Sequence, residues 1–166
     1  WSWSRGLGDV YKRQLFMLVG FLYERRHTRN ISSFGGIKIT MPKYAAIFLF
    51  TSFASIGLPG LNGFVGEFMI LMGSYDHYKV LTSIAAFGVV LAAIYMLWAY
   101  QRIFTGPISN DKNENLNDLN IRETLSIAPL MLLMLFIGIY PSFIESFVIQ
   151  EAGFLSETIA LFKDIN

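Results

Sequence analysis

Carboxylates are the side chains best suited to chemistry in this chain of 166 residues, and one of them stands apart. Glu67 is the only charged residue in the apolar stretch 44–74, seven residues before Ser74. That spacing places it about 10 Å inward along a helix rising 1.5 Å per residue. A carboxylate at such depth in a membrane costs several kcal/mol unless it is neutralised, paired or hydrated. We therefore predict that Glu67 takes up and releases protons, the alternative being a carboxylate that only bonds a neighbouring helix.

The other reactive side chains offer few candidates for catalysis or metal binding. The chain has no cysteine, so it cannot form disulfides, thiolate zinc sites or thiolate-bound iron–sulfur clusters. His27 and His77 lie far apart, without a second metal ligand at a suitable spacing. Both sit at the ends of apolar stretches, where hydrated positions are expected; a proton relay through His27 is the alternative. The other acids, including the cluster within 111–123, are expected to be solvated or interfacial charges.

Glycine and proline interrupt the apolar stretch just before Glu67. The interruption reads Gly57-Leu58-Pro59-Gly60-Leu61-Asn62-Gly63. Proline removes a backbone donor and clashes with the preceding helical turn, and glycine permits non-helical backbone angles. The stretch of about 31 residues is also too long for one straight span, which needs about 20. We predict two half-helices, 44–57 and 63–74, joined by an unwound segment; a continuous helix kinked at proline is the alternative.

The composition predicts a membrane protein. Hydrophobic residues make up 54% of the chain and charged residues only 15%, and the mean hydropathy is +0.47. Soluble domains carry about 25% charged residues. The net charge of +1 argues against a nucleic-acid partner, which would require a clustered basic surface.

We expect an all-α integral membrane fold in a single membrane domain, 15–166, with the lipid bilayer as a partner. Its expected elements are the end of a truncated span (15–23), the broken span (44–74), two further spans (80–100 and 125–140), a loop (101–123) and a short amphipathic interfacial helix (153–165). Residues 1–14 lack an apolar stripe, and 7–14 resemble a translated sequencing adapter. We therefore predict that residues 1–14 are spurious; a genuine amphipathic N-terminus is the alternative.

Basic residues predict the orientation, because Lys and Arg are enriched in short cytoplasmic loops. Loop 24–43 carries five of the thirteen, and loop 101–123 carries three. The hairpin 75–79 and the C-terminal tail, expected on the opposite side, carry only Lys79 and Lys163. Both loops are therefore expected in the cytoplasm and the C-terminus on the outer, periplasmic side of a bacterial-type inner membrane.

Four strings resemble one known family. They are YERRHTR (23–29), GG followed by MPK (35–36 and 41–43), ASIGLPGLNGFVGEFMIL (54–71) and YPSF (140–143). The chain resembles the C-terminal part of the M-type, antiporter-like subunits of NADH-quinone oxidoreductase (respiratory complex I). The sister L and N types typically carry lysine near position 67, whereas the M type carries glutamate.

The resemblance implies a membrane-arm subunit that contributes the end of a proton-translocation channel, with Glu67 in its terminal proton-transfer site. It further implies neighbouring L-type and N-type subunits. No cofactor is expected in this chain; NAD, FMN, iron–sulfur clusters and quinone are expected in partner subunits. A cation/proton antiporter subunit, a membrane-bound hydrogenase subunit and a purely structural membrane subunit are the alternatives.

Overall fold

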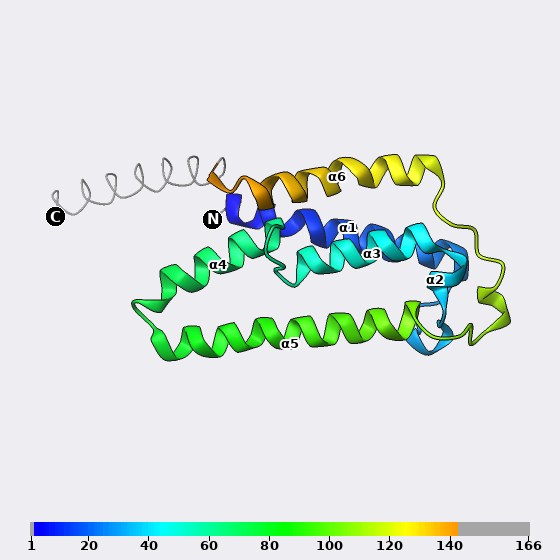
Figure 1. Cartoon of the computed structure of the whole chain (residues 1–166), viewed down its shortest axis with the longest axis horizontal. Coiled ribbons are helices and arrows are strands. Elements are labelled where there is room, and N and C mark those ends of the chain that lie inside the picture. Colours follow the sequence, from blue (N-terminus) through cyan, green and yellow to red (C-terminus); the bar gives the residue numbers. More distant parts are fainter. Residues whose placement is uncertain (1, 143–166) are drawn as a thin grey trace.

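The computed structural model describes residues 2–142, and within that range it contains helices, turns and loops but no strand. The expectation of an all-α fold is confirmed for these residues. The α-helices are α1 (Ser2–Arg26), α2 (Ile37–Thr40), α3 (Pro42–Ser55), α4 (Asn62–Tyr75), α5 (Lys79–Phe104) and α6 (Ile121–Ile139). Figure 1 shows α1, α3, α5 and α6 aligned along one long axis, with α4 slanting between the end of α3 and the start of α5. The amphipathic helix expected at 153–165 lies outside the described residues.

Two helices are long and apolar enough to cross a membrane. They are α5, with 26 residues and a mean hydropathy of 2.3 over its most apolar stretch, and α6, with 19 residues and 1.6. A helix of 26 residues is about 39 Å long, more than the roughly 30 Å of hydrocarbon in a bilayer. Much of α5 is exposed in this chain, with Val80 at 74% and Ile84 at 64%. Its apolar surface suits contact with lipid or with further helices.

Several helix boundaries differ from the expected ones. α5 continues beyond Tyr100 to Phe104, and ends where Thr105 and Gly106 (φ 89°) leave helical geometry. α6 begins at Ile121, because Asn120 and Glu123 form a reciprocal capping box. The span expected from residue 125 therefore starts four residues earlier, and its signal, N-x-x-E, is visible in the sequence.

The first helix begins at Ser2, whereas we expected it to start at Leu15. Gln14 on this helix is fully buried, and neither atom of its side-chain amide has a hydrogen-bond partner. An unpaired buried amide is costly, so an apolar residue would suit this position better. Whether residues 1–14 are foreign to the protein stays a prediction.

An aromatic cluster holds α3 against α5. Phe104 stacks on Tyr100 with ring centroids 4.6 Å apart and packs on Phe48 at 5.0 Å. Tyr44 lies 5.6 Å from Phe104 and donates its hydroxyl to the carbonyl of Leu18 on α1, at 2.8 Å. The last turn of α5 places Phe104 among these rings, where it is 1% exposed. Burial of Phe104 in this cluster therefore stabilises the last turn.

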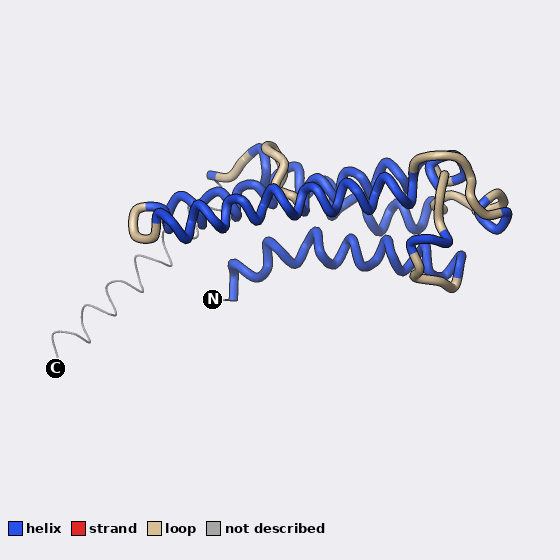
Figure 2. The backbone as a smooth tube through the Cα atoms, turned by 90° about the horizontal axis from the view of Figure 1, so that it is seen from below, coloured by secondary structure: helices blue, strands red, loops and turns tan. Residues whose placement is uncertain are grey.

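The two polar loops meet at one end of the bundle. Figures 1 and 2 place both the connection from α1 to α3 and the connection from α5 to α6 at the end where α2 lies. Gly36 N–H donates to the Thr105 carbonyl at 3.3 Å, and the Ser109 hydroxyl donates to the Phe34 carbonyl at 3.2 Å. A Cβ on Gly36 would lie 2.8 Å from the backbone nitrogen of Ile108, so only glycine permits this approach.

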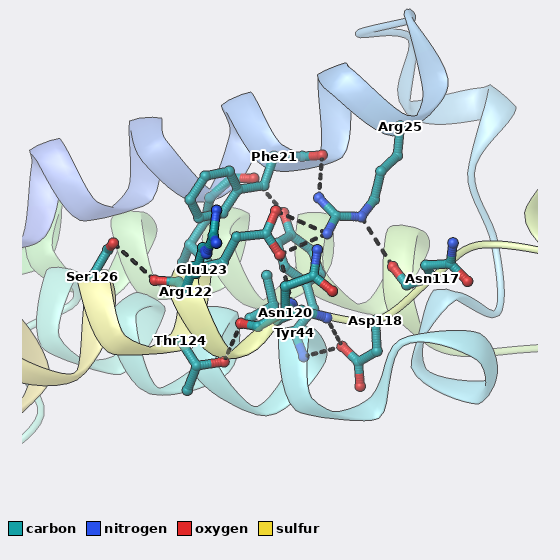
Figure 3. Close-up of polar contacts among 12 residues, drawn as sticks. Phe21, Arg25, Tyr44, Asn117, Asp118, Asn120, Arg122, Glu123, Thr124 and Ser126 are labelled. Atoms are coloured by element: carbon teal, nitrogen blue, oxygen red, sulfur yellow. Dashed lines mark hydrogen bonds and ion pairs between the residues drawn. The ribbon is translucent and has the colours of Figure 1, made fainter.

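An ion pair between Arg25 and Glu123 joins α1 to α6 at this end (Figure 3). Arg25 Nη2 lies 2.9 and 2.7 Å from the two carboxylate oxygens, and Arg25 Nε donates to the Asn117 carbonyl at 2.9 Å. The side chains are only 14% and 19% exposed. Glu123 was expected to be a solvated charge; it is instead paired, because the capping box turns it toward α1.

Asp118 also departs from the solvated role expected for it. Its carboxylate accepts hydrogen bonds from the backbone N–H groups of Lys43, at 2.9 Å, and Tyr44, at 3.1 Å. These donors belong to the first turn of α3, which lacks a side-chain cap of its own. A carboxylate at a helix N-terminus satisfies free donors and complements the helix dipole.

We expect Glu123→Ala to lower the free energy of unfolding of the full-length protein by about 1–3 kcal/mol, because it leaves the Arg25 guanidinium without its charged partner. Thermal unfolding in detergent, followed by circular dichroism, measures the effect. Glu114→Ala is the control, since Glu114 is an exposed acid in the loop before α6. Equal stability of the two variants would show that the ion pair contributes nothing.

Candidate functional site

The candidate site is the segment between α3 and α4, where the backbone leaves and re-enters helical geometry (Figure 1). α3 ends at Ser55 and is closed by Gly57, whose φ of 72° lies in the left-handed region. Leu58 N–H donates to the Phe53 carbonyl at 3.1 Å. This six-to-one hydrogen bond after a left-handed glycine is the Schellman motif, a common helix terminus.

A tight turn follows at once. Leu61 N–H donates to the Leu58 carbonyl at 3.1 Å, which closes a turn with Pro59 and Gly60 as its central residues. Gly60 has a φ of 92°. Proline before a glycine with positive φ is the sequence pattern of a type II turn. The order G-L-P-G therefore encodes a helix stop and a turn, each of which supplies some of its own hydrogen bonds.

Glu67 lies on α4, and its side chain reaches back to this segment. Side chains on a helix tilt toward its N-terminus, so a residue in the second turn of α4 can approach the end of α3. A Cβ built on Gly57 would lie 2.5 Å from Glu67 Oε2 and 3.4 Å from Glu67 Cδ. The half-buried carboxylate thus rests against the Gly57 backbone, in space that any side chain at position 57 would fill.

The segment is also packed tightly on both sides. A Cβ on Gly63, in the first turn of α4, would collide with the carbonyl oxygen of Ala54. A Cβ on Gly138 of α6 would collide with the carbonyl group of Gly60 and with the Leu61 Cα. Ala54, Leu61 and Met134 form a small buried apolar cluster beside these contacts. Glycines at 63 and 138 therefore allow three helix backbones to meet at the interruption.

The structure brings together most of the predicted site residues but not all. Gly57 and Glu67 are in contact, and Pro59, Gly60 and Gly63 lie in the same short region. His27, considered as a relay, is exposed and follows α1 at the end of the bundle where the polar loops meet, away from the interruption. Its φ of 50° and the hydrogen bond from its N–H to the Tyr23 carbonyl make it a left-handed helix cap.

Sequence reasoning missed Gly138, which forms the α6 side of the site. Its only signal is a glycine within the last apolar stretch, and such glycines are common in membrane helices. Among residues 2–142 no group of three or more metal-binding side chains occurs.

Residues 9–95, more than half of the chain, match the model of the family described as NADH:quinone oxidoreductase/Mrp antiporter, TM. The matched region contains the interruption and Glu67. The chain belongs to this family. Its membrane location follows from that membership together with the apolar helices α5 and α6.

The relatives of this antiporter-family chain include curated proteins named NADH-quinone oxidoreductase subunit M. The protein from Rickettsia bellii is 46% identical over 128 residues, covering 77% of this chain and 26% of the relative. The protein from Mycobacterium tuberculosis H37Rv is 40% identical, covering 76% and 23%. The chain thus spans about a quarter of the length of these relatives.

A solved structure has a similar fold. A chain of respiratory complex I from Thermus thermophilus with bound NADH superposes with a TM-score of 0.71 at 35% sequence identity. The match covers 80% of this chain and 28% of that one. The resemblance expected from the four sequence strings is confirmed.

We expect Gly57→Ala to destabilise the full-length protein more than Gly60→Ala. Both substitutions place alanine at a positive φ, which costs about 1–2 kcal/mol. Only the alanine at 57 also displaces the Glu67 carboxylate, because the space around a Cβ at position 60 is open. Thermal unfolding in detergent compares the two variants, and a larger loss in Gly60→Ala would contradict the contact with Glu67.

Proposed function

We propose that this chain is part of a membrane-arm subunit of a proton-pumping NADH:quinone oxidoreductase, in which Glu67 transfers protons at the end of a translocation channel. The observation that carries the proposal is the half-buried carboxylate resting on Gly57 at a helix interruption, in a family match that includes this region. The names of the relatives and of the structural neighbour support the same assignment over an antiporter or hydrogenase subunit.

In this proposal α3 and α4 are the two halves of one interrupted membrane span. Non-helical backbone at membrane depth is tolerated only where it faces protein or a water-filled cavity. The turn at 58–61 meets that condition on the side of α6, through Gly138. The side bearing Glu67 is where water and the rest of the subunit would supply and remove the proton.

The chemistry required of Glu67 is simple. Its carboxylate binds a proton delivered along the channel and becomes neutral, which lowers the cost of its position in the membrane. A change in the charge distribution of the membrane arm then returns it to the anion, and the proton leaves toward the outer side. The first turn of α4 has no side-chain cap, and the free N–H groups of a helix start favour a nearby anion.

The bacterial inner membrane is the proposed location, with the C-terminus on the outer side. The two loops that carry most of the basic residues lie at the same end of the bundle, as a shared cytoplasmic position requires. L-type and N-type subunits are the proposed neighbours. NADH oxidation and quinone reduction, with FMN and iron–sulfur clusters, belong in this proposal to partner subunits.

We expect Glu67→Gln in the full-length subunit to reduce proton pumping by about tenfold or more, because the amide cannot carry the transferred proton. Glu67→Asp, which keeps a carboxylate, should have a milder effect. Pumping is measured as NADH-driven acidification in vesicles that contain the assembled complex. Asp76→Asn is the control, since Asp76 is an exposed acid just after α4.

Full pumping by the Gln variant would refute the role of Glu67 in proton transfer. Infrared difference spectra give a second readout. A carboxyl band that titrates and disappears in Glu67→Gln is expected. A band that stays constant across the accessible pH range would assign Glu67 a structural role instead.

His27→Asn tests whether the histidine relays protons. Asparagine also adopts the left-handed conformation, so the helix cap is kept while the imidazole is removed. We expect pumping to stay within about twofold of the original, because a cap contributes to stability and not to proton transfer. A pumping loss as large as that of Glu67→Gln would show that His27 lies on the proton path.

A further inference from the structure

One face of α6 is buried from Ile127 to Ile137. Ile127 and Met134 are both 0% exposed, and their separation of seven residues returns to the same side of a helix. The two residues contact different parts of the molecule. Ile127 belongs to the core cluster formed with α1 and α3, whereas Met134 packs with Ala54 and Leu61 beside the helix interruption. The C-terminal part of this face therefore packs against the interruption, and the N-terminal part packs against the main core.

Gly138 extends that face by one more turn, because it follows Met134 by four residues. A Cβ at 138 would overlap the carbonyl carbon and oxygen of Gly60 and the Cα of Leu61. All three are backbone atoms, so no side-chain rotation can relieve the overlap. The α6 backbone thus lies directly against the type II turn.

The turn is short and internally bonded, so its two ends move together. Leu58 is bonded to Phe53 on one side and to Leu61 on the other. Gly60, which touches α6, is separated by two residues from Gly57, which touches the Glu67 carboxylate. A displacement of Gly60 therefore reaches Gly57 through a segment with little freedom to absorb it.

We propose that Gly138 is a positioning residue for proton transfer, which holds the turn at 58–61, and through it the Glu67 carboxylate, by bringing the α6 backbone against Gly60. This inference rests on the proposed role of Glu67 and extends it to a helix that contributes no titratable group at the site. The absence of a side chain at 138 is the property that matters. Even a methyl group there requires α6 and the turn to separate.

The test uses Gly138→Ala in the full-length subunit within the assembled complex. NADH-driven pumping per complex is expected to fall about three- to tenfold, since misplacement of a reacting group by a fraction of an ångström is costly. Gly88→Ala is the matched control, because a Cβ at that position of α5 meets no atom within 4 Å. It should pump normally.

A second readout separates positioning from a general loss of stability. A hydrophobic carbodiimide modifies protonated carboxyl groups, and peptide mass spectrometry locates the product at Glu67. The pH midpoint of that modification is expected to shift by about half a unit or more in Gly138→Ala, because the surroundings of the carboxylate change. It should stay unchanged in Gly88→Ala.

Met134→Ala provides an independent variant, because it loosens the same contact without creating an overlap. It should reduce pumping and shift the modification of Glu67 in the assembled complex. Ile127→Ala is its control, with equal burial on the same helix but contacts to the other cluster. If Gly138→Ala fails to assemble, Met134→Ala decides alone.

Normal pumping and an unshifted modification profile in the variants that assemble would overturn the inference about Gly138. Such a result leaves the proton-transfer role of Glu67 intact as long as Glu67→Gln pumps poorly. Normal pumping by Glu67→Gln would instead overturn the proposed function. The two failures are therefore distinguishable.

Discussion

Between Ser55 and Asn62 the backbone leaves helical geometry, so its polar groups lose the hydrogen-bond partners that a continuous helix would supply. The chain meets this demand locally, through the Leu58–Phe53 and Leu61–Leu58 hydrogen bonds. Neighbouring helix backbones also approach the turn closely, because glycines at 63 and 138 leave room for them. Much of what distinguishes this bundle follows from that requirement: the position of α4, the glycine on α6 and the space occupied by Glu67.

The interruption could be predicted from the sequence because its signals are local. Pro59 and the flanking glycines act on the backbone within a few residues, and a single acid in an apolar stretch is conspicuous. Glu123 and Gly138 could not be assigned in this way. Glu123 pairs with a residue 98 positions away, and Gly138 matters because of a carbonyl that reaches it from another helix. The sequence around a residue gives no local signal of a contact that it makes with a distant segment.

Helix ends show the same division between local and distant causes. The start of α6 at Ile121 is written in a capping box that could have been read from the sequence. The extension of α5 to Phe104 has no such signal. It depends on rings from α3, since Phe104 is buried only when Phe48 and Tyr44 lie beside it. Tertiary packing therefore decides where this helix stops.

The contact between the two polar loops has a consequence for how the chain is made. Arg25 bonds to Asn117, Asp118 bonds to the first turn of α3, and Gly36 bonds to Thr105. Each of these bonds joins residues that lie on the two sides of α5 in the sequence. None of these bonds can form until α5 has been synthesised and the loop after it has returned to the end of the bundle where α2 lies. Until then, α1 and α3 are joined by their own contacts, such as the hydrogen bond from the Tyr44 hydroxyl to the Leu18 carbonyl. The contacts between the two polar loops therefore form late, after the helices α1, α3 and α5 have been synthesised.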